Sequence, residues 1–486
     1  MDHPATTEAA AIGAAAGSHI LRSSGARTGG AKLASQVVGR IVQDITAAGW
    51  PVGQVIGSEP ELLGRYGVSR AVLREAVRLL EHQQVARMRR GPGGGLVVTV
   101  PTIESAIDAV MVHLIYVRAT VGDVYEARLA VEESVAELAA ERLTEDALAQ
   151  LRDLTKRESR GEVRDHRELH SLLAAITQNP GLEFFVDLLS RVTLLYAPES
   201  STITLPVLTS SARAHAKIVE SVIAGSESEA RHRMHRHLEA EAEFMQRESP
   251  SELRLGVVFG VPAGATKLAE SVARRLFAEV MRSGWKVGEP IGSETELMER
   301  YDISRAVLRE AVRVLEHHQI ARMRRGPGGG LFVDEPGADA TTAAVALHLD
   351  RRGIRPRHLF EVRRIVEMAV LNRVVERLDG RATQSLLDVL EVERSTAREQ
   401  FPVVGHDLHV VLAELSGNPV LTLLTDVLVH LSRSHGAMPD DASGPLPTEA
   451  VIETHGGIVE AIMARDLDLA RHRMRRHLDA LVHWVR

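Results

Sequence analysis

The sequence predicts a mainly α-helical protein in which two winged helix-turn-helix domains are each followed by an antiparallel helical bundle. Three observations support this fold class: a long internal repeat, a composition rich in Ala, Leu, Val, Arg and Glu with only 3% aromatic residues, and apolar stripes at helical spacing along most of the chain. A chain of 486 residues also exceeds what one ordinary hydrophobic core organises, so several domains are expected.

The internal repeat sets the domain organisation. VSRAVLREAVRLLEHQQVARMRRGPGGGL begins at Val68, and ISRAVLREAVRVLEHHQIARMRRGPGGGL begins at Ile303. Downstream, EARLAVEESVAELAAERL from Glu126 aligns with EVRRIVEMAVLNRVVERL from Glu361. Solenoid repeats are only some tens of residues long. This chain is therefore a whole two-domain protein written twice, as copy one and copy two.

Composition places the segments between the repeated parts. The N-terminus is Ala-rich and lacks the basic region of a signal peptide, and the stretch between the copies mixes polar residues with Gly and Pro. The predicted parts are a disordered tail (1–30), a winged helix-turn-helix and a helical bundle in copy one (31–100 and 101–247), a linker (248–265), and the same two domains in copy two (266–335 and 336–486).

Charge and residue content exclude several classes of protein. The net charge of −7 argues against a protein that coats nucleic acid over its whole surface, but it allows a local basic face. Without cysteine there is no disulfide and no thiolate metal site, so a metal would need His, Asp or Glu ligands. No apolar run reaches the length of a membrane span. We expect a cytoplasmic protein without a membrane partner.

The start of copy one has the pattern of a helix-turn-helix. Apolar residues at helical spacing predict a first helix over 33–48, which Pro51 follows. Ser58, with Glu61 three residues later, has the pattern of a capping box that opens a short second helix. Gly67 then supplies the tight turn before the third helix.

The predicted third helix has a row of arginines. Ser69 caps it, and it runs from Arg70 to about residue 82, with Arg70, Arg74 and Arg78 opposite the apolar stripe. Arginine can bond O6 and N7 of guanine together or grip a phosphate. Such a row is more often only a solvated surface, so the helix alone does not establish contact with DNA.

A basic hairpin follows the third helix. VARMRR and LVVTV are two short β-type runs on either side of a glycine-rich turn at 91–95, which predicts a wing. A glycine tip would let the wing backbone approach DNA closely, although such loops are usually just flexible turns. The ordered set of helix, turn, arginine helix and basic wing favours DNA binding over those simpler interpretations.

SRAVLREAVRLLE followed by this hairpin resembles the winged helix of GntR-type bacterial regulators, in particular the FadR-like branch. The resemblance implies a double-stranded DNA operator as partner. The residues implied to enter the major groove are Ser69, Arg70 and Arg74, with Ser304, Arg305 and Arg309 in copy two. Those implied at the wing tip near the minor groove are Arg90 and Gly91, with Arg325 and Gly326 in copy two. One departure is that Pro60 and Thr295 stand where the family has an arginine that contacts DNA.

The second domain of each copy reads as helical throughout. In copy one, the stretches with helical spacing are 104–117, 122–141, 144–158, 164–177, 181–196, 207–224 and 227–246. Several successive amphipathic helices with short connections predict an antiparallel bundle.

Histidines recur at matching places in the two bundles. The sets, each spread over three predicted helices, are His170, His215 and His237 in copy one and His409, His455 and His477 in copy two. Three converging imidazoles would suit a divalent transition metal such as zinc or nickel. His166, four residues before His170, could add a fourth ligand from the same helical face. Against this, the chain contains 22 histidines, and a surface or capping role is commoner for any single one.

The bundle resembles the FCD domain, which is the ligand-binding partner of FadR-like winged helices. The three histidines match that family's metal site in both copies, but its aspartate does not, because His166 stands there in copy one and Gly405 in copy two. The resemblance therefore favours a metal in copy one and argues against one in copy two. It also implies that Arg128 and Arg363 grip a carboxylate effector. The alternative is an intrahelical ion pair, from Arg128 to Glu132 and from Arg363 to Glu367.

These features together predict a sequence-specific transcriptional regulator, a repressor rather than an enzyme, whose operator binding responds to a small organic acid. Because two-fold protein symmetry mirrors a palindromic operator, the fused copies would act as a pseudo-dimer on paired half-sites, as one chain or as a homodimer. Two alternatives are a metal-dependent hydrolase that uses the histidine clusters, and a DNA-binding scaffold whose bundles bind no ligand.

Overall fold

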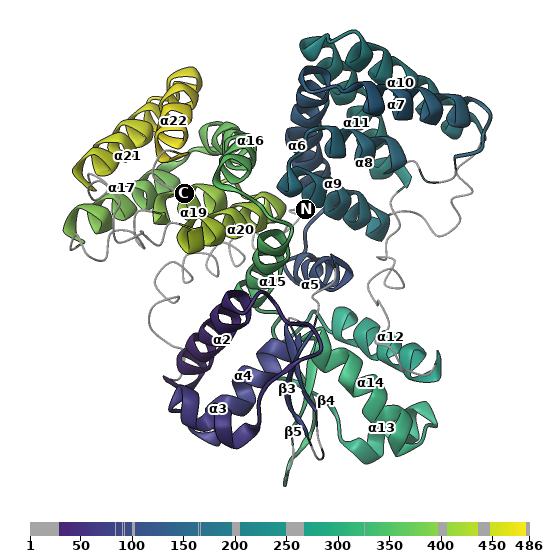
Figure 1. Ribbon diagram of the computed structural model, residues 1–486, viewed down its shortest axis with the longest axis vertical. Helices are drawn as coiled ribbons and strands as arrows, with labels where there is room; N and C mark the ends of the chain where they lie inside the picture. Colours follow the sequence, from purple (N-terminus) through teal and green to yellow (C-terminus); the bar gives the residue numbers. More distant parts are fainter. Residues whose placement is uncertain are drawn as a thin grey trace, which may run out of the picture. The chain divides into compact units, whose positions relative to one another are not determined.

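The computed structural model confirms the mainly α-helical fold (Figure 1). The residues that it describes are 29–82, 84–89, 91, 93–99, 103–163, 165, 167–196, 205–248, 267–324, 326–396, 406–435 and 448–482. The predicted linker from residue 249 onward and the first 28 residues of the predicted tail lie outside this part. The chain forms two compact units, Met1–Thr102 and Ile103–Arg486.

The first unit has the predicted helix-turn-helix and wing. Its elements are α2 (Gly29–Ala47), β1 (Val55–Gly57), α3 (Glu59–Tyr66), α4 (Arg70–His82), β2 (Ala86–Arg89) and β3 (Gly95–Val98). The predicted capping interaction is present, since the backbone N–H of Ser58 donates to Oε2 of Glu61 at 2.7 Å. Gly67 ends α3 in the left-handed conformation with φ of 64°, which frees the chain to turn into α4.

Strand β1 is absent from the sequence prediction. The sheet order is β1-β3-β2, with both pairings antiparallel, so the wing has three strands rather than the two of a hairpin. Gly95 makes this pairing possible: its φ is 154°, and a Cβ atom there would lie 2.5 Å from the carbonyl oxygen of Gly57. A three-residue strand is too short to give a periodic pattern, which is why the sequence did not show it.

Copy two repeats this architecture within the second unit. Its elements are α12 (Lys267–Arg282), β4 (Pro290–Gly292), α13 (Glu294–Tyr301), α14 (Arg305–His317), β5 (Ala321–Arg324) and β6 (Gly330–Val333). Strand β6 again lies between the other two. In α13 the capping box is reciprocal, because Ser293 N–H donates to Glu296 and Glu296 N–H donates to the Ser293 hydroxyl.

The remainder of the second unit consists of two bundles. Bundle one contains α5 (Ile103–Tyr116), α6 (Val121–Glu141), α7 (Glu145–Ser159), α8 (Arg167–Ile176), α9 (Pro180–Thr193), a 3₁₀ turn (Leu194–Tyr196), α10 (Leu205–Ile223) and α11 (Glu227–Glu248). Bundle two contains α15 (Ala338–Arg351), α16 (Pro356–Arg377), α17 (Gly380–Ser395), α19 (Asp407–Leu415), α20 (Pro419–His435), α21 (Thr448–Met463) and α22 (Leu467–Val482). No helix in these described ranges is long and apolar enough to cross a membrane.

Each bundle is built around one central helix. In bundle one α6 packs against α8, α9, α10 and α11, and in bundle two α16 packs against α19, α20, α21 and α22. The buried residues of each central helix recur every three or four positions and form one broad buried side, as expected for a helix that several others cover. Arg128 and Arg363 lie on these central helices and are therefore buried charges, 4% and 0% exposed.

The two bundles contact each other through equivalent asparagines. Asn179, at the start of α9, donates to Oε2 of Glu361 at 2.8 Å, and Asn418, at the start of α20, donates to Oε2 of Glu126 at 2.8 Å. Both asparagine side chains also cap their own helices, which leaves the amide nitrogen free to donate across the interface. Repeat-equivalent residues thus exchange reciprocal bonds, as in a two-fold symmetric dimer.

Candidate DNA-reading face and histidine centres

The arginine row on α4 is exposed. Leu73 and Ala76 are buried beneath the helix, whereas Ser69, Arg70 and Arg74 face outward. The Ser69 hydroxyl accepts from the backbone N–H of residue 72 at 3.4 Å and so caps the helix, as predicted. The Arg74 guanidinium lies 3.5 Å from the Glu59 carboxylate. An exposed pair of this kind is worth under about 1 kcal/mol, so a phosphate could replace the carboxylate.

Helix α14 presents the equivalent face in copy two. Ser304, Arg305 and Arg309 are exposed, and the Ser304 hydroxyl accepts from the N–H of residue 307 at 3.4 Å. Here Arg305 is the residue that pairs with a carboxylate, at 3.1 Å from Glu294. An exposed arginine face is therefore present in both copies.

The wing tips are only partly described. Gly91 and Gly326 adopt φ values of 100° and 99°, which a residue with a side chain rarely adopts. Arg90 and Arg325, the predicted minor-groove residues, lie outside the described residues.

The three histidines of copy one meet in the core of bundle one. Nε2 of His237 lies 3.2 Å from Nε2 of His215 and 3.4 Å from Nε2 of His170. All three side chains are at most 5% exposed. Three nitrogens bound at about 2.05 Å to a tetrahedral zinc ion are separated by roughly 3.3 Å, so the spacing fits a first-row divalent metal.

Copy two has the same cluster. Nε2 of His477 lies 3.2 Å from Nε2 of His455 and 3.3 Å from Nε2 of His409, and all three rings are buried. The sequence favoured a metal in copy one over copy two. The family's aspartate is missing from both copies, but copy one has His166 in its place and copy two has Gly405. His166 and Gly405 lie outside the described residues, and α8 begins at Arg167. Within the described residues, the histidine geometry does not distinguish the two copies.

Carboxylates orient two histidines of each cluster. In copy one, Nδ1 of His170 bonds to Glu132, and Nδ1 of His215 bonds to Oε1 of Glu158 at 2.7 Å. In each ring a carboxylate at Nδ1 holds the proton there and leaves Nε2 with a free electron pair directed at the cluster centre. Carboxylate–histidine pairs of this kind are the usual support of metal ligands.

The same pairs recur in copy two, from His409 to Glu367 at 2.6 Å and from His455 to Glu393 at 2.9 Å. Glu158 and Glu393 were not identified from the sequence. They occupy matching places in the repeat, and that match was the signal that could have found them.

Each buried arginine makes the intrahelical ion pair that the sequence offered as an alternative. Arg128 Nε lies 2.6 Å from Glu132, and Arg363 Nε lies 2.7 Å from Glu367. Because each glutamate also holds a histidine, arginine and histidine cluster are linked through one carboxylate. Glu367 bonds to Nε of Arg363, so this ion pair by itself does not exclude an effector from the rest of that guanidinium. In Arg128, Nη1 also lies 3.1 Å from Oε2 of Glu241.

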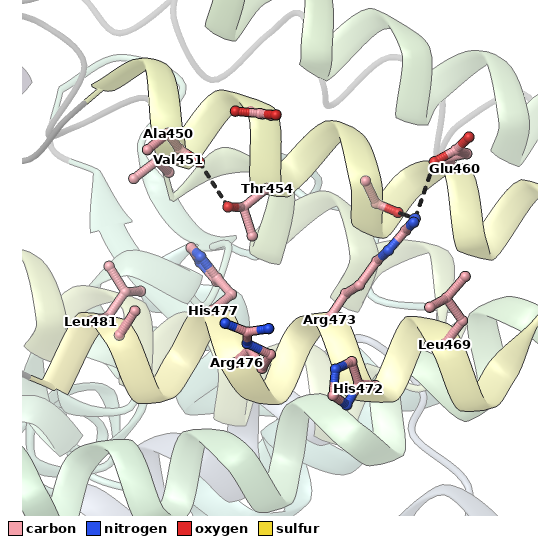
Figure 2. Close-up of a pocket in the computed structure, with 13 residues that line it drawn as sticks. Ala450, Val451, Thr454, Glu460, Leu469, His472, Arg473, Arg476, His477 and Leu481 are labelled. Carbon is pink, nitrogen blue, oxygen red and sulfur yellow. Dashed lines mark hydrogen bonds and ion pairs between the residues drawn. The ribbon is translucent and has the colours of Figure 1, made fainter.

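A groove leads to the cluster of copy two. It has a volume of about 760 Å³ and lies between α21 and α22, as Figure 2 shows. His477 points from α22 into this groove, and Leu481 lies one turn further along the same helix. Arg473 closes one side through its ion pair with Glu460 at 3.1 Å. One member of the histidine cluster is thus part of a cavity wall.

The histidine cluster makes the metal-free protein sensitive to acid. Burial lowers the pKa of His237 to about 3, against about 6.5 in an unfolded chain. Between these values the unfolded state binds more protons, so stability is lost as the pH falls below about 6.5. With a chelator present, urea denaturation should show that this residue contributes a loss of about 2 kcal/mol between pH 7.5 and pH 5.

Replacing His237 by leucine should remove that part of the pH dependence. His232→Leu, an exposed position on the same helix, is the matched control and should keep it. An equal pH dependence in the His237→Leu protein would show that this imidazole is not buried in its neutral form.

Comparison with protein families identifies both domain types. The FCD domain family matches residues 123–240 and 358–480, and the bacterial regulatory proteins of the gntR family match residues 33–97 and 268–333. Both families therefore match twice, once in each copy. The matched ranges contain the arginine faces of both heads and the histidine clusters of both bundles.

Curated relatives and solved structures match about one copy of this chain. The HTH-type transcriptional repressor NanR of Cronobacter sakazakii is 26% identical over 226 residues, which cover 45% of this chain and 86% of that protein. The Uxu operon regulator of Haemophilus influenzae is 26% identical over 214 residues, covering 43% and 78%. A GntR structure from Streptococcus agalactiae, 23% identical, covers 44% of this chain and 99% of its own, with a TM-score of 0.37. None of these relatives supports the hydrolase alternative. The chain belongs to the gntR family of bacterial regulatory proteins and is a DNA-binding transcriptional regulator that carries two GntR-type DNA-binding domains and two FCD domains in tandem.

Proposed function

We propose that one chain acts as a pseudo-dimeric repressor that reads a paired half-site operator in the cytoplasm. The observation that carries this proposal is the pair of equivalent, exposed arginine faces, Arg70 and Arg74 on α4 with Arg305 and Arg309 on α14. A separate homodimer would need two chains to supply these two faces. Here the fusion provides both at high effective concentration.

The reciprocal contacts between the bundles support the same proposal. Asn179 with Glu361 and Asn418 with Glu126 join the two halves of one chain through equivalent positions. The same glutamates also form ion pairs with arginines, and these arginines are not at matching places in the repeat. Arg142 donates to Glu361, and Arg373 donates to Glu126. A surface already used between the halves of one chain is not available to a second chain.

The FCD domains are the proposed sensors. His170, His215 and His237 would hold a divalent metal such as zinc or nickel in copy one, and His409, His455 and His477 would hold one in copy two. His166 stays a predicted additional ligand. A bound metal supplies a Lewis acid that attracts a carboxylate oxygen, and Arg128 or Arg363 would bind the same small carboxylate effector from its other side.

Helix α5 offers a route from sensor to DNA-reading head. Tyr116, at its end, contacts the ring of Trp285 in the copy-two head with ring centroids 5.4 Å apart, and its hydroxyl lies 3.3 Å from Glu335. Helix α5 also packs against α15 of bundle two, so movement of either bundle would reach the copy-two head. Effector binding would alter DNA affinity only if it favours one arrangement of the heads over another.

Selection from a pool of randomised duplex DNA tests the reading function. The full chain should enrich a sequence with two related half-sites, and native mass spectrometry on the shortest enriched duplex should show one chain per duplex. Two chains per duplex would contradict the pseudo-dimer, while leaving the DNA-reading role intact. Binding without enrichment, which only weakens as salt rises, would contradict the sequence-specific role itself.

A further inference from the structure

We propose that only the copy-two FCD domain binds a carboxylate effector, and that in copy one the carboxylate of Glu241 permanently occupies the effector's position. This inference rests on the proposed function, in which an effector carboxylate binds between the metal and the buried arginine. It concerns how that site has diverged between the two copies.

In copy one, Glu241 bridges the two groups that would bind an effector. Its Oε2 lies 3.1 Å from Nη1 of Arg128, and its Oε1 lies 3.4 Å from Nε2 of His237. A side chain of this protein therefore supplies the charged carboxylate between arginine and histidine cluster.

In copy two, no glutamate stands at the corresponding place. Glu241 lies four residues after His237, and the residue four after His477 is Leu481. Leucine cannot pair with a guanidinium. Arg363 Nη1 instead bonds to the hydroxyl of Ser432 at 3.1 Å, while Nη2 is buried and has no hydrogen-bond partner among the described residues. The whole Arg363 side chain is 0% exposed.

The charges around the two arginines differ by one carboxylate. Arg128 faces Glu132 and Glu241, whereas the described carboxylate bonded to Arg363 is Glu367, which it shares with His409. A buried donor without a hydrogen-bond partner destabilises the folded state, and more so when it is charged. An anion that bonds to Nη2 of Arg363 removes this destabilisation, so the site in copy two is suited to an anionic ligand.

Two further features of copy two fit a ligand site. Nδ1 of His406 is also buried, with no hydrogen-bond partner in the part of the chain that the structure describes, and the His406 ring lies 6.3 Å from that of His409. The groove between α21 and α22 has both His477 and Leu481 in its wall (Figure 2). Leu481, which stands in copy two at the place of Glu241, thus lines this groove together with His477. The ligand class is a small carboxylate that can accept hydrogen bonds from a guanidinium and an imidazole.

Chains with a single metal site separate the two copies experimentally. In the full-length His215→Ala protein only the copy-two cluster is complete, and in His455→Ala only the copy-one cluster is complete. Each is loaded with Co²⁺, whose visible spectrum reports its ligands, and titrated with acetate as the carboxylate probe. We expect acetate to change the spectrum of the copy-two site and not that of the copy-one site.

Exchanging the diverged residues should reverse this result. Glu241→Leu added to the copy-one chain should make its cobalt spectrum respond to acetate, and Leu481→Glu added to the copy-two chain should abolish the response. Glu243→Leu, an exposed position on α11, is the matched control and should change nothing. The gain of response in Glu241→Leu does not depend on whether the Leu481→Glu protein folds.

The outcomes distinguish this inference from the proposed function. A response of the copy-one chain with Glu241 in place, or of the copy-two chain carrying Leu481→Glu, overturns the inference. A response found only after Glu241→Leu also overturns it, although a carboxylate sensor remains. Cobalt bound in every chain without any response to acetate overturns both the inference and the proposed carboxylate site.

Discussion

Replacing Arg70 and Arg305 together by alanine should abolish operator selection. Each arginine is the first residue of its recognition helix, is exposed, and follows a serine that caps the helix. A bidentate contact from arginine to guanine is worth about 1–3 kcal/mol, so losing two should weaken operator binding by at least about 30-fold. Fluorescence anisotropy with the selected duplex measures this loss.

Binding to unrelated DNA should change much less. Arg74, Arg309 and the arginines of the wings remain to contact phosphates, which supply affinity without sequence information. The matched control is Arg152→Ala, an exposed arginine on α7 in bundle one, which should leave both affinities unchanged. If the double variant bound the operator and unrelated DNA with equally reduced affinity, these arginines would be phosphate contacts rather than readers of bases.

Much of the fold was predictable because local signals dominate it. The apolar stripe and the Ser58–Glu61 capping box fixed the positions of the helices in the head, and α4 spans Arg70–His82 as predicted. The helical periods of bundle one likewise fell within a few residues of α5 to α11. Strand β1 was not predicted, because its pairing partner β3 lies far along the chain and three residues are too few to show a periodic pattern.

The histidine clusters were predictable only in part. The repeat placed three histidines on three helices twice, and the structure brings both sets together. Glu158 and Glu393 also recur at matching places, but nothing local in the sequence connects them to the clusters, because each reaches its histidine from another helix, 57 and 62 residues away. The role of Glu241 could not be predicted by comparing the copies, because copy two has no glutamate at the corresponding place.

Removing one histidine from each cluster should abolish metal binding. His215 and His455 are each 0% exposed, and each is held by a carboxylate on its Nδ1, from Glu158 and Glu393. We expect the purified chain to retain two zinc ions, measured by atomic emission after dialysis. His215→Ala and His455→Ala should each retain one, and the double variant none.

Thermal unfolding should follow the metal content. Zinc at about 1,000 times its dissociation constant stabilises a protein by about 4 kcal/mol per site, provided that the unfolded chain does not bind it. Each single variant should therefore lose the zinc-dependent rise in Tm of one FCD domain, and without zinc the variants should differ far less from the parent. His232→Ala, exposed on α11, is the control for a histidine outside the cluster. Two zinc ions retained by either single variant would mean that the remaining two imidazoles and a carboxylate suffice as ligands. In copy one that carboxylate would be Glu241, which already lies 3.4 Å from Nε2 of His237.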